Sequence, residues 1–251
     1  MAAVAGTGIL VPLYIYPGDA PTCSAWQPLL NAIHANPFVP FTVIVNPDSG
    51  PGGAPGAQPD ASYQGCVPLL AAHANVRTVG YVPTHYGARS AADVDADIGA
   101  YAGWDAAYAP EGIFFDEVEP TSEFLALYTS FAGTARASFA GGDGLVFLNP
   151  GASVQDDGFF AIADQIVTAE DYYSDFSPSQ LSLRSSSPAS KQAVILHDAP
   201  SSPPTSLLSQ LVSDGIGSLY ISDDTQANNG NPYDSFPSDL SSLAAALGAD
   251  S

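Results

Sequence analysis

The stretch GIFFDEVEP, residues 112–120, carries three consecutive apolar residues directly into Asp116 and Glu117. A third acid, Glu119, follows, and a proline ends the run. Burying a carboxylate costs several kcal/mol unless it is paired or hydrogen-bonded. The stretch therefore predicts a buried strand whose acidic end serves a purpose other than core packing.

Seven other short apolar runs share this design, and each closes in polar or turn residues. Their cores are nearly continuously apolar rather than alternating, which is typical of strands that are buried on both faces of a parallel sheet covered by helices. Together with GIFFDE at 112–117 they make eight predicted strands, the others being 9–17, 41–47, 76–84, 145–151, 165–170, 192–198 and 218–224.

Segments with apolar residues at helical spacing lie between these runs. The clear ones cover 23–36, 62–75, 90–104, 121–140, 203–215 and 237–248, whereas 152–163 and 175–191 are weaker and predict only a turn or two of helix. Eight strands alternating with helices predict a single-domain (β/α)8 TIM barrel over residues 1–251. An open doubly wound sheet is the alternative, but no glycine-rich phosphate loop follows the first strand.

The ends of the predicted strands are polar, and the catalytic loops of such barrels follow the strand ends. Gathered at one rim, these side chains would form a polar cup with several tyrosines, a combination typical of sugar-binding clefts. The predicted substrate-binding residues are Tyr14, Tyr16, Asn46, Tyr81, Tyr86, Asn149, Tyr172, His197 and Asp223. The alternative for the histidines is a structural role at the rim or in the core, with the ring nitrogens hydrogen-bonded within the protein. The Gly- and Pro-rich segment 46–60 is expected to be a long loop at the same mouth, with a disordered surface loop as the alternative.

Two carboxylates at a barrel rim suggest glycoside hydrolysis, in which one acid donates a proton and the other stabilises or attacks the oxocarbenium-like carbon. Asp116 and Glu170 close the fourth and sixth predicted strands and form the candidate pair. Glu117 is the third candidate. Its alternative role is to interact with the dipole of the following helix.

Composition narrows the class of partner. The chain has 26 Asp and Glu against 5 Lys and Arg, a net charge of −21, which argues against nucleic acid and anionic lipid and leaves neutral or cationic partners. No apolar run reaches the roughly 18 residues of a membrane span, so membrane insertion is not expected. The first residues lack a basic region typical of a signal peptide. Cys23 and Cys66 either form a disulfide or remain two buried thiols.

Several segments, in order, resemble the spherulin-4 family, also classed as glycoside hydrolase family 135. They are PLYIYP at 12–17, VNPDSGPG at 45–52, VGYVPTHYGAR at 79–89, GIFFDE at 112–117, LNPG at 148–151, VTAEDYY at 167–173, and SDD with NPYDSFPSDL between 222 and 240. The resemblance implies a (β/α)8 barrel. It also implies an activity like that of the characterised members, fungal endo-α-1,4-N-acetylgalactosaminidases that cut galactosaminogalactan, a partly deacetylated and hence cationic polysaccharide.

The resemblance also implies roles for the three acids. Asp116 would be the nucleophile or charge stabiliser and Glu170 the general acid/base, with the reverse order left open. Glu117 would hold substrate hydroxyls or tune its neighbour. No metal is expected, because the acidic segment SDDTQANNGNPYD at 222–234 does not fit a calcium-loop pattern. No cofactor is expected either, and the expected state is a monomer.

Two other classes of protein remain. One is a non-catalytic carbohydrate-binding or spore and cell-wall structural protein. The other is a metal-dependent polysaccharide deacetylase, which four scattered histidines disfavour. The resemblance favours an extracellular or cell-wall location, with the cytoplasm as the alternative.

Overall fold

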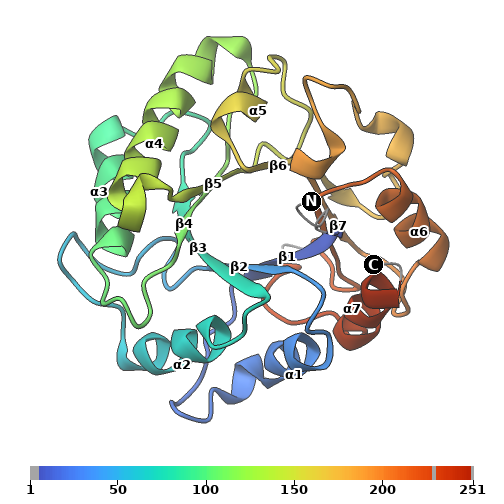
Figure 1. The fold of residues 1–251 in the computed structure, drawn as a ribbon, viewed down its shortest axis with the longest axis horizontal. Coiled ribbons are helices and arrows are strands. Elements are labelled where there is room, and N and C mark those ends of the chain that lie inside the picture. Colours follow the sequence, from blue (N-terminus) through green and yellow to red (C-terminus); the bar gives the residue numbers. More distant parts are fainter. Residues whose placement is uncertain (1–5, 228–229, 250–251) are drawn as a thin grey trace.

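Eight parallel strands close into a barrel in sequence order, with β8 pairing back to β1 (Figure 1). The computed structural model describes residues 6–227 and 230–249. The strands are β1 (Gly8–Leu13), β2 (Phe41–Val45), β3 (Val76–Pro83), β4 (Gly112–Asp116), β5 (Leu145–Leu148), β6 (Gln165–Tyr172), β7 (Gln192–His197) and β8 (Ser218–Ile221). The predicted (β/α)8 barrel is confirmed.

Helices surround the barrel and cover the outer face of its strands (Figure 1). They are α1 (Gln27–Ala35), α2 (Ala61–Ala71), α3 (Ala91–Ala102), α4 (Leu125–Ser138), α5 (Phe159–Ile162), α6 (Thr205–Ser213) and α7 (Leu240–Ala249). The two weak helical segments are short, as expected: α5 is a single turn, and the connection from β6 to β7 holds only the 3-10 turns η4 (Pro178–Gln180) and η5 (Ala189–Lys191). None of the described helices is long and apolar enough to cross a membrane.

The strands are apolar throughout because both of their faces are covered. All six residues of β1 are buried, and so are the first four of β4. Gly112 opens β4 where the chains lie very close, since a Cβ there would lie 2.1 Å from the carbonyl oxygen of Leu145 on β5. Any larger residue at this position would push β4 away from the first residue of β5.

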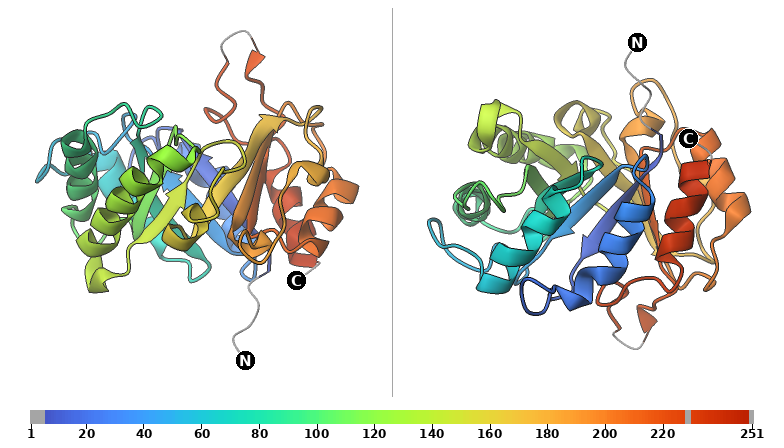
Figure 2. Two further views of the ribbon diagram at one scale, coloured as in Figure 1. Left: turned by 90° about the horizontal axis from the view of Figure 1, so that it is seen from above. Right: turned by 60° about the horizontal axis from the view of Figure 1, so that its bottom comes forward.

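The polar rim lies at the carboxyl end of the barrel. The segment from β8 to α7, of which residues 222–227 and 230–239 are described, extends beyond this end (Figure 2). At the same end, Asp60 begins α2 by accepting hydrogen bonds from the backbone N–H groups of Ser62 and Tyr63. Such caps satisfy N–H groups that have no partner within the helix.

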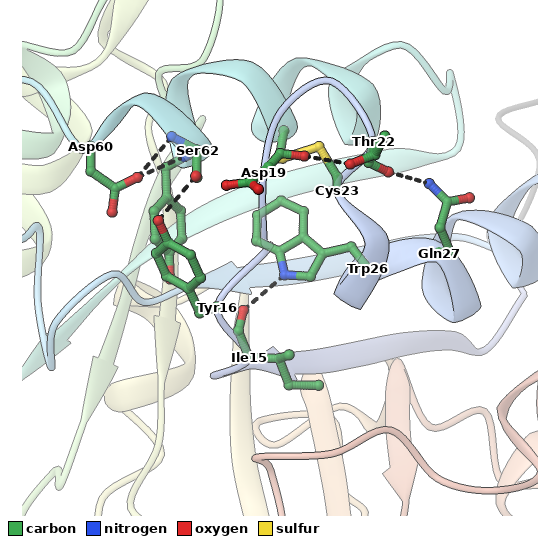
Figure 3. Close-up of a disulfide and its surroundings, with 11 residues drawn as sticks. Ile15, Tyr16, Asp19, Thr22, Cys23, Trp26, Gln27, Asp60 and Ser62 are labelled. Carbon is green, nitrogen blue, oxygen red and sulfur yellow. Dashed lines mark hydrogen bonds between the residues drawn. A yellow bond between two sulfur atoms is a disulfide. The ribbon is translucent and has the colours of Figure 1, made fainter.

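Cys23 and Cys66 form a disulfide, which settles the alternative that the sequence left open (Figure 3). The bridge ties the loop after β1 to α2, and both cysteines are fully buried. Next to it, the indole of Trp26 donates to the carbonyl of Ile15 at 2.8 Å. The loop after β1 is therefore held by a covalent bond and by the hydrogen bond of Trp26.

Removing this bridge should destabilise the barrel. The cysteines are 43 residues apart, and a cross-link over a loop of this length stabilises by about 4 kcal/mol through the unfolded state. We expect the double variant Cys23→Ala, Cys66→Ala to lose most of that free energy of unfolding in chemical denaturation. Reduced wild type is the matched comparison, and thiol titration of denatured, unreduced wild type should find no thiol. An unchanged denaturation midpoint would contradict the prediction.

Candidate active site

Asp116 and Glu170 meet through one side chain between them. Asn149, directly after β5, uses its Nδ2 to donate to Oδ1 of Asp116 at 2.8 Å and to Oε2 of Glu170 at 2.7 Å. These two carboxylate oxygens cannot lie farther apart than the sum of the two bonds, about 5.5 Å. The two acids sit on β4 and β6, which are separated in the barrel by β5 alone.

Two tyrosine hydroxyls complete the hydrogen bonds of the acids. Tyr81 on β3 donates to Oδ2 of Asp116 at 2.7 Å, and Tyr233 from the segment between β8 and α7 donates to Oε1 of Glu170. Tyr14, directly after β1, packs edge-on against both rings, with ring centroids 5.4 and 5.7 Å away. Each carboxylate therefore accepts hydrogen bonds on both oxygens, and its orientation is fixed.

The environment makes Asp116 a weaker acid than usual. Burial and, after it, the nearby charge of Glu170 raise the pKa of Asp116 to about 6, although hydrogen bonds from Tyr81 and Asn149 favour the ionised form. Burial and then Asp116 also raise the pKa of Tyr81 far above its usual value, so that its hydroxyl keeps its proton and donates. The two acids therefore share a site that disfavours two negative charges.

Glu117 lies beside this pair in an uncommon backbone conformation. Its φ of 55° is in the left-handed region, which non-glycine residues rarely adopt. Its Oε2 is buried and accepts no hydrogen bond from the described residues, and the imidazole Nε2 of His85 lies 3.5 Å from it. Glu117 thus holds a carboxylate beside Asp116 whose Oε2 has the imidazole of His85 as its polar neighbour.

The three acids and Asn149 line a cleft of about 350 Å³, a volume within the range of small-molecule sites. The lining residues are Tyr86, Asp116, Glu117, Asn149, Pro150, Gly151, Glu170, His197 and Gln226. A second cleft of about 450 Å³ includes His85 in its lining, together with the loop after β2. Glu117 and His85 therefore stand between two adjoining hollows on the same face.

The structure brings together most of the predicted site. All three candidate acids line the cleft, as do Tyr86, Asn149 and His197. Tyr81 and Tyr14 stand behind the acids rather than in the lining. The imidazole of His197 is almost fully buried, and its Nδ1 lies 2.7 Å from Oδ2 of Asp198. The functional roles assigned to all these residues stay predictions.

Besides Tyr14 and Tyr81, four predicted residues do not line the cleft: Tyr16, Asn46, Tyr172 and Asp223. The hydroxyl of Tyr16 donates to Ser62 on α2 at 3.0 Å (Figure 3). Asn46 accepts a backbone N–H of its own loop at 2.9 Å, Tyr172 packs edge-on against His197, and Asp223 accepts the backbone N–H of position 238. Each of these four residues makes a contact within the protein itself, and substrate binding by them stays a prediction.

Sequence reasoning missed Tyr233 and Gln226, which both come from the long segment between β8 and α7. Neither follows a strand directly, so the rule that placed polar strand ends at the rim did not select them. The aromatic residue in NPYDSFPSDL, inside an otherwise polar segment, was the available signal for Tyr233. Among the described residues, no three His, Cys, Asp or Glu side chains are placed to hold a metal ion.

Known proteins are similar to this chain in sequence and in fold. Residues 8–247 match the family Spherulin4, described as Spherulation-specific family 4. Spherulin-4 of Physarum polycephalum is 34% identical over 252 residues, which cover 96% of this chain and 70% of that protein.

Two solved structures show the same fold. The crystal structure of Aspergillus clavatus Sph3 in complex with GalNAc superposes with a TM-score of 0.78 and 30% identity, covering 97% of this chain and 98% of that one. XacCel5A has a TM-score of 0.50 at 11% identity over 97% and 98% of the two chains, which shows a common barrel fold alone.

Proposed function

The chain belongs to the Spherulin4 family, and from this membership we propose that it is a glycoside hydrolase that cleaves an α-1,4-linked polymer of N-acetylgalactosamine and galactosamine, such as galactosaminogalactan. The observation that carries the proposal is the pair Asp116 and Glu170, bridged by Asn149 within a cleft. The GalNAc bound to the related Sph3 supports an amino-sugar substrate.

The spacing of the pair favours a retaining mechanism. Carboxyl groups lie about 5–5.5 Å apart in retaining enzymes and roughly 6.5–9.5 Å apart in inverting ones, which need room for a water molecule. The oxygens of Asp116 and Glu170 that Asn149 bridges lie within about 5.5 Å of each other. A separation this short leaves little room for a water molecule between the two carboxylates.

In the proposed first step, Oδ1 or Oδ2 of Asp116 attacks the anomeric carbon while the glycosidic bond breaks. Glu170 gives its proton to the leaving oxygen. In the second step, Glu170 takes a proton from water, and the resulting hydroxide displaces Asp116 from the sugar. Tyr81 and Asn149 hold Asp116 in the orientation for attack, and Tyr233 and Asn149 hold Glu170.

The reaction needs one proton on the pair, because one acid must be ionised and the other protonated. The raised pKa of Asp116, about 6, reports how readily the site takes up this proton. In a coupled pair the proton belongs to both groups rather than to either one, so activity follows the number of protons on the pair.

Activity should therefore decline as the pH rises above about 6. The singly protonated pair predominates below the pKa and is lost above it, so kcat/KM is expected to fall about tenfold per pH unit between roughly 6.5 and 8. Initial rates on galactosaminogalactan oligosaccharides from pH 4 to 8 give the profile. Melting temperatures over the same range control for unfolding, and a flat profile up to pH 8 would contradict the shared-proton assignment.

The direct test of function is incubation with galactosaminogalactan, with and without a chelator, followed by analysis of oligosaccharides and free acetate. Shortened chains without acetate are the expected result. Released acetate would instead indicate a deacetylase, and retention of the polymer without either product would indicate a carbohydrate-binding protein. Asp116→Asn is the inactive control.

The proposed setting of the protein is outside the cell or in the cell wall. A buried disulfide persists in oxidising compartments and is rare in the cytosol. The net charge of −21 suits a cationic amino-sugar polymer and repels polyanions. A monomer without cofactor stays the expected state.

A further inference from the structure

The backbone beside the catalytic pair holds several left-handed residues. Glu117 has a φ of 55°, and in the facing loop His85 and Tyr86 have φ values of 47° and 54°. Residues other than glycine rarely adopt this conformation. Such strain persists only where the surroundings hold it, and it clusters at functional sites.

A buried hydrogen-bond chain holds the strained segment. Oγ1 of Thr84, directly after β3, lies 2.8 Å from the carbonyl oxygen of Glu117 and 2.9 Å from that of Asp116. The same Oγ1 lies 2.9 Å from the hydroxyl of Tyr128, which also accepts the backbone N–H of Glu119 at 2.9 Å. Thr84 and Tyr128 are both fully buried.

The direction of the chain follows from its protons. Thr84 has one hydroxyl hydrogen, which it must give to a carbonyl, because a carbonyl oxygen cannot donate. The hydroxyl of Tyr128 therefore donates to Thr84. Burial raises the pKa of Tyr128, so this hydroxyl keeps its proton. The order is thus Glu119 N–H to Tyr128, Tyr128 to Thr84, and Thr84 to the carbonyls of Asp116 and Glu117.

Tyr128 belongs to α4, a helix on the outside of the barrel. Its hydroxyl thus links the outer layer to the turn between β4 and α4. A second bond fixes the same turn from the facing loop, since Tyr86 donates its backbone N–H to the carbonyl of Glu117 at 2.6 Å. The carbonyl of Glu117 thus accepts from two elements, and the peptide that follows it has little freedom to rotate.

We propose that Thr84 and Tyr128 are positioning residues, which hold the left-handed turn so that the carboxylate of Glu117 faces the cleft and can accept a hydrogen bond from a substrate hydroxyl or N–H group. The proposal rests on the proposed glycosidase function. Glu117 lines the cleft, and its Oε2 accepts no hydrogen bond from the described residues and has the imidazole Nε2 of His85 3.5 Å away, so this carboxylate keeps the capacity to accept from a substrate donor. Thr84 and Tyr128 do not line the cleft and act through Glu117.

The test removes one hydroxyl at a time. Tyr128→Phe should lower kcat/KM on galactosaminogalactan oligosaccharides by roughly 10- to 100-fold, because displacements on the order of 1 Å in a site cost about that much. Tyr101→Phe is the matched control: Tyr101 is equally buried on α3, and its hydroxyl donates to the carbonyl of Val45 at 3.0 Å. It should lose similar stability but stay within about twofold of wild-type activity.

A double-mutant cycle separates positioning from general destabilisation. If Tyr128 acts through Glu117, Tyr128→Phe should change kcat/KM by less than about twofold in a Glu117→Gln background. Fully multiplicative losses would overturn the proposal. If Tyr128→Phe does not fold, Thr84→Val replaces it in the cycle, and Thr84→Ser, which keeps the hydroxyl, should restore activity.

A structural readout makes the outcome independent of the proposed function. In a crystal structure of Tyr128→Phe, the carboxylate of Glu117 should move by on the order of 1 Å or adopt more than one position. An unmoved, fully ordered Glu117 would overturn the positioning role even if the enzyme is active. Wild type that cleaves no galactosaminogalactan would overturn the proposed function alone, and this crystal structure would still decide on the hydrogen-bond chain.

Discussion

Asp116→Asn is expected to reduce turnover of galactosaminogalactan oligosaccharides by roughly four orders of magnitude or more, since an amide cannot form the glycosyl-enzyme bond. Glu170→Gln should lose comparably on the natural substrate, because the leaving oxygen then departs unprotonated. The two losses should not multiply in the double variant, since both residues serve one reaction step.

Leaving-group dependence distinguishes the two roles. Glu170→Gln should recover most of its first-step rate on an aryl glycoside with a good leaving group, whereas Asp116→Asn should not. Azide, which needs no general base, should accelerate turnover of the glycosyl-enzyme in Glu170→Gln. Proton NMR of the first wild-type product should show the α anomer, as retention requires. Recovery by Asp116→Asn and not by Glu170→Gln would mean that the roles are reversed.

Stability measurements control for folding in these variants. The pKa of Asp116 is raised to about 6 from a usual value near 3.8, so its ionised form opposes folding by about 3 kcal/mol at neutral pH. This penalty is nearly absent at pH 4, grows as the pH rises from about 4 to about 6, because only the unfolded state loses the proton there, and is complete above about 6. Asp116→Asn should therefore melt higher than wild type at pH 7.5 and similarly at pH 4. Near-normal turnover in a well-folded Asp116→Asn would end the proposed mechanism.

Asn149→Ala is expected to have the largest effect after substitution of the two acids, a loss of roughly 100- to 1000-fold in kcat/KM. This is the scale seen when one fixed donor is removed from a catalytic charge. Its Nδ2 is the group that bridges both acids, so without it the two carboxylates repel each other and lose their alignment. Its hydrogen bond also lowers the pKa of Asp116, so the alkaline limb of the pH profile should move to higher pH in the variant.

Asn46→Ala is the matched comparison, because Asn46 also precedes a proline at the end of a strand, yet its side chain bonds to its own loop outside the cleft. It should lose far less activity and keep the wild-type pH profile. Equal losses in both variants would show that Asn46 binds substrate as its position in the sequence predicts. An unshifted pH profile in Asn149→Ala would show that Asn149 does not influence the pKa of the acid pair.

Much of this molecule could be predicted from the sequence, because strand periodicity and burial are local properties. Continuous apolar runs ending in polar residues identified all eight strands and the barrel, and they placed Asp116 and Glu170 at its rim. Parallel strands of a barrel all end on one face, so a residue at a strand end is at the rim whatever the loops do. For the same reason Asn149 and His197 were found.

Only the tertiary structure decided which rim residues meet. Tyr233 reaches Glu170 from a segment without periodicity, and the pairing of Cys23 with Cys66 depends on how the loop after β1 lies against α2. Tyr16 and Asn46 satisfy the same sequence pattern as Asn149, but the hydroxyl of Tyr16 bonds to Ser62 on α2 and the side chain of Asn46 bonds to its own loop. Side-chain contacts across a barrel mouth depend on strand stagger and loop path to within an ångström, and no local spacing rule encodes either of them.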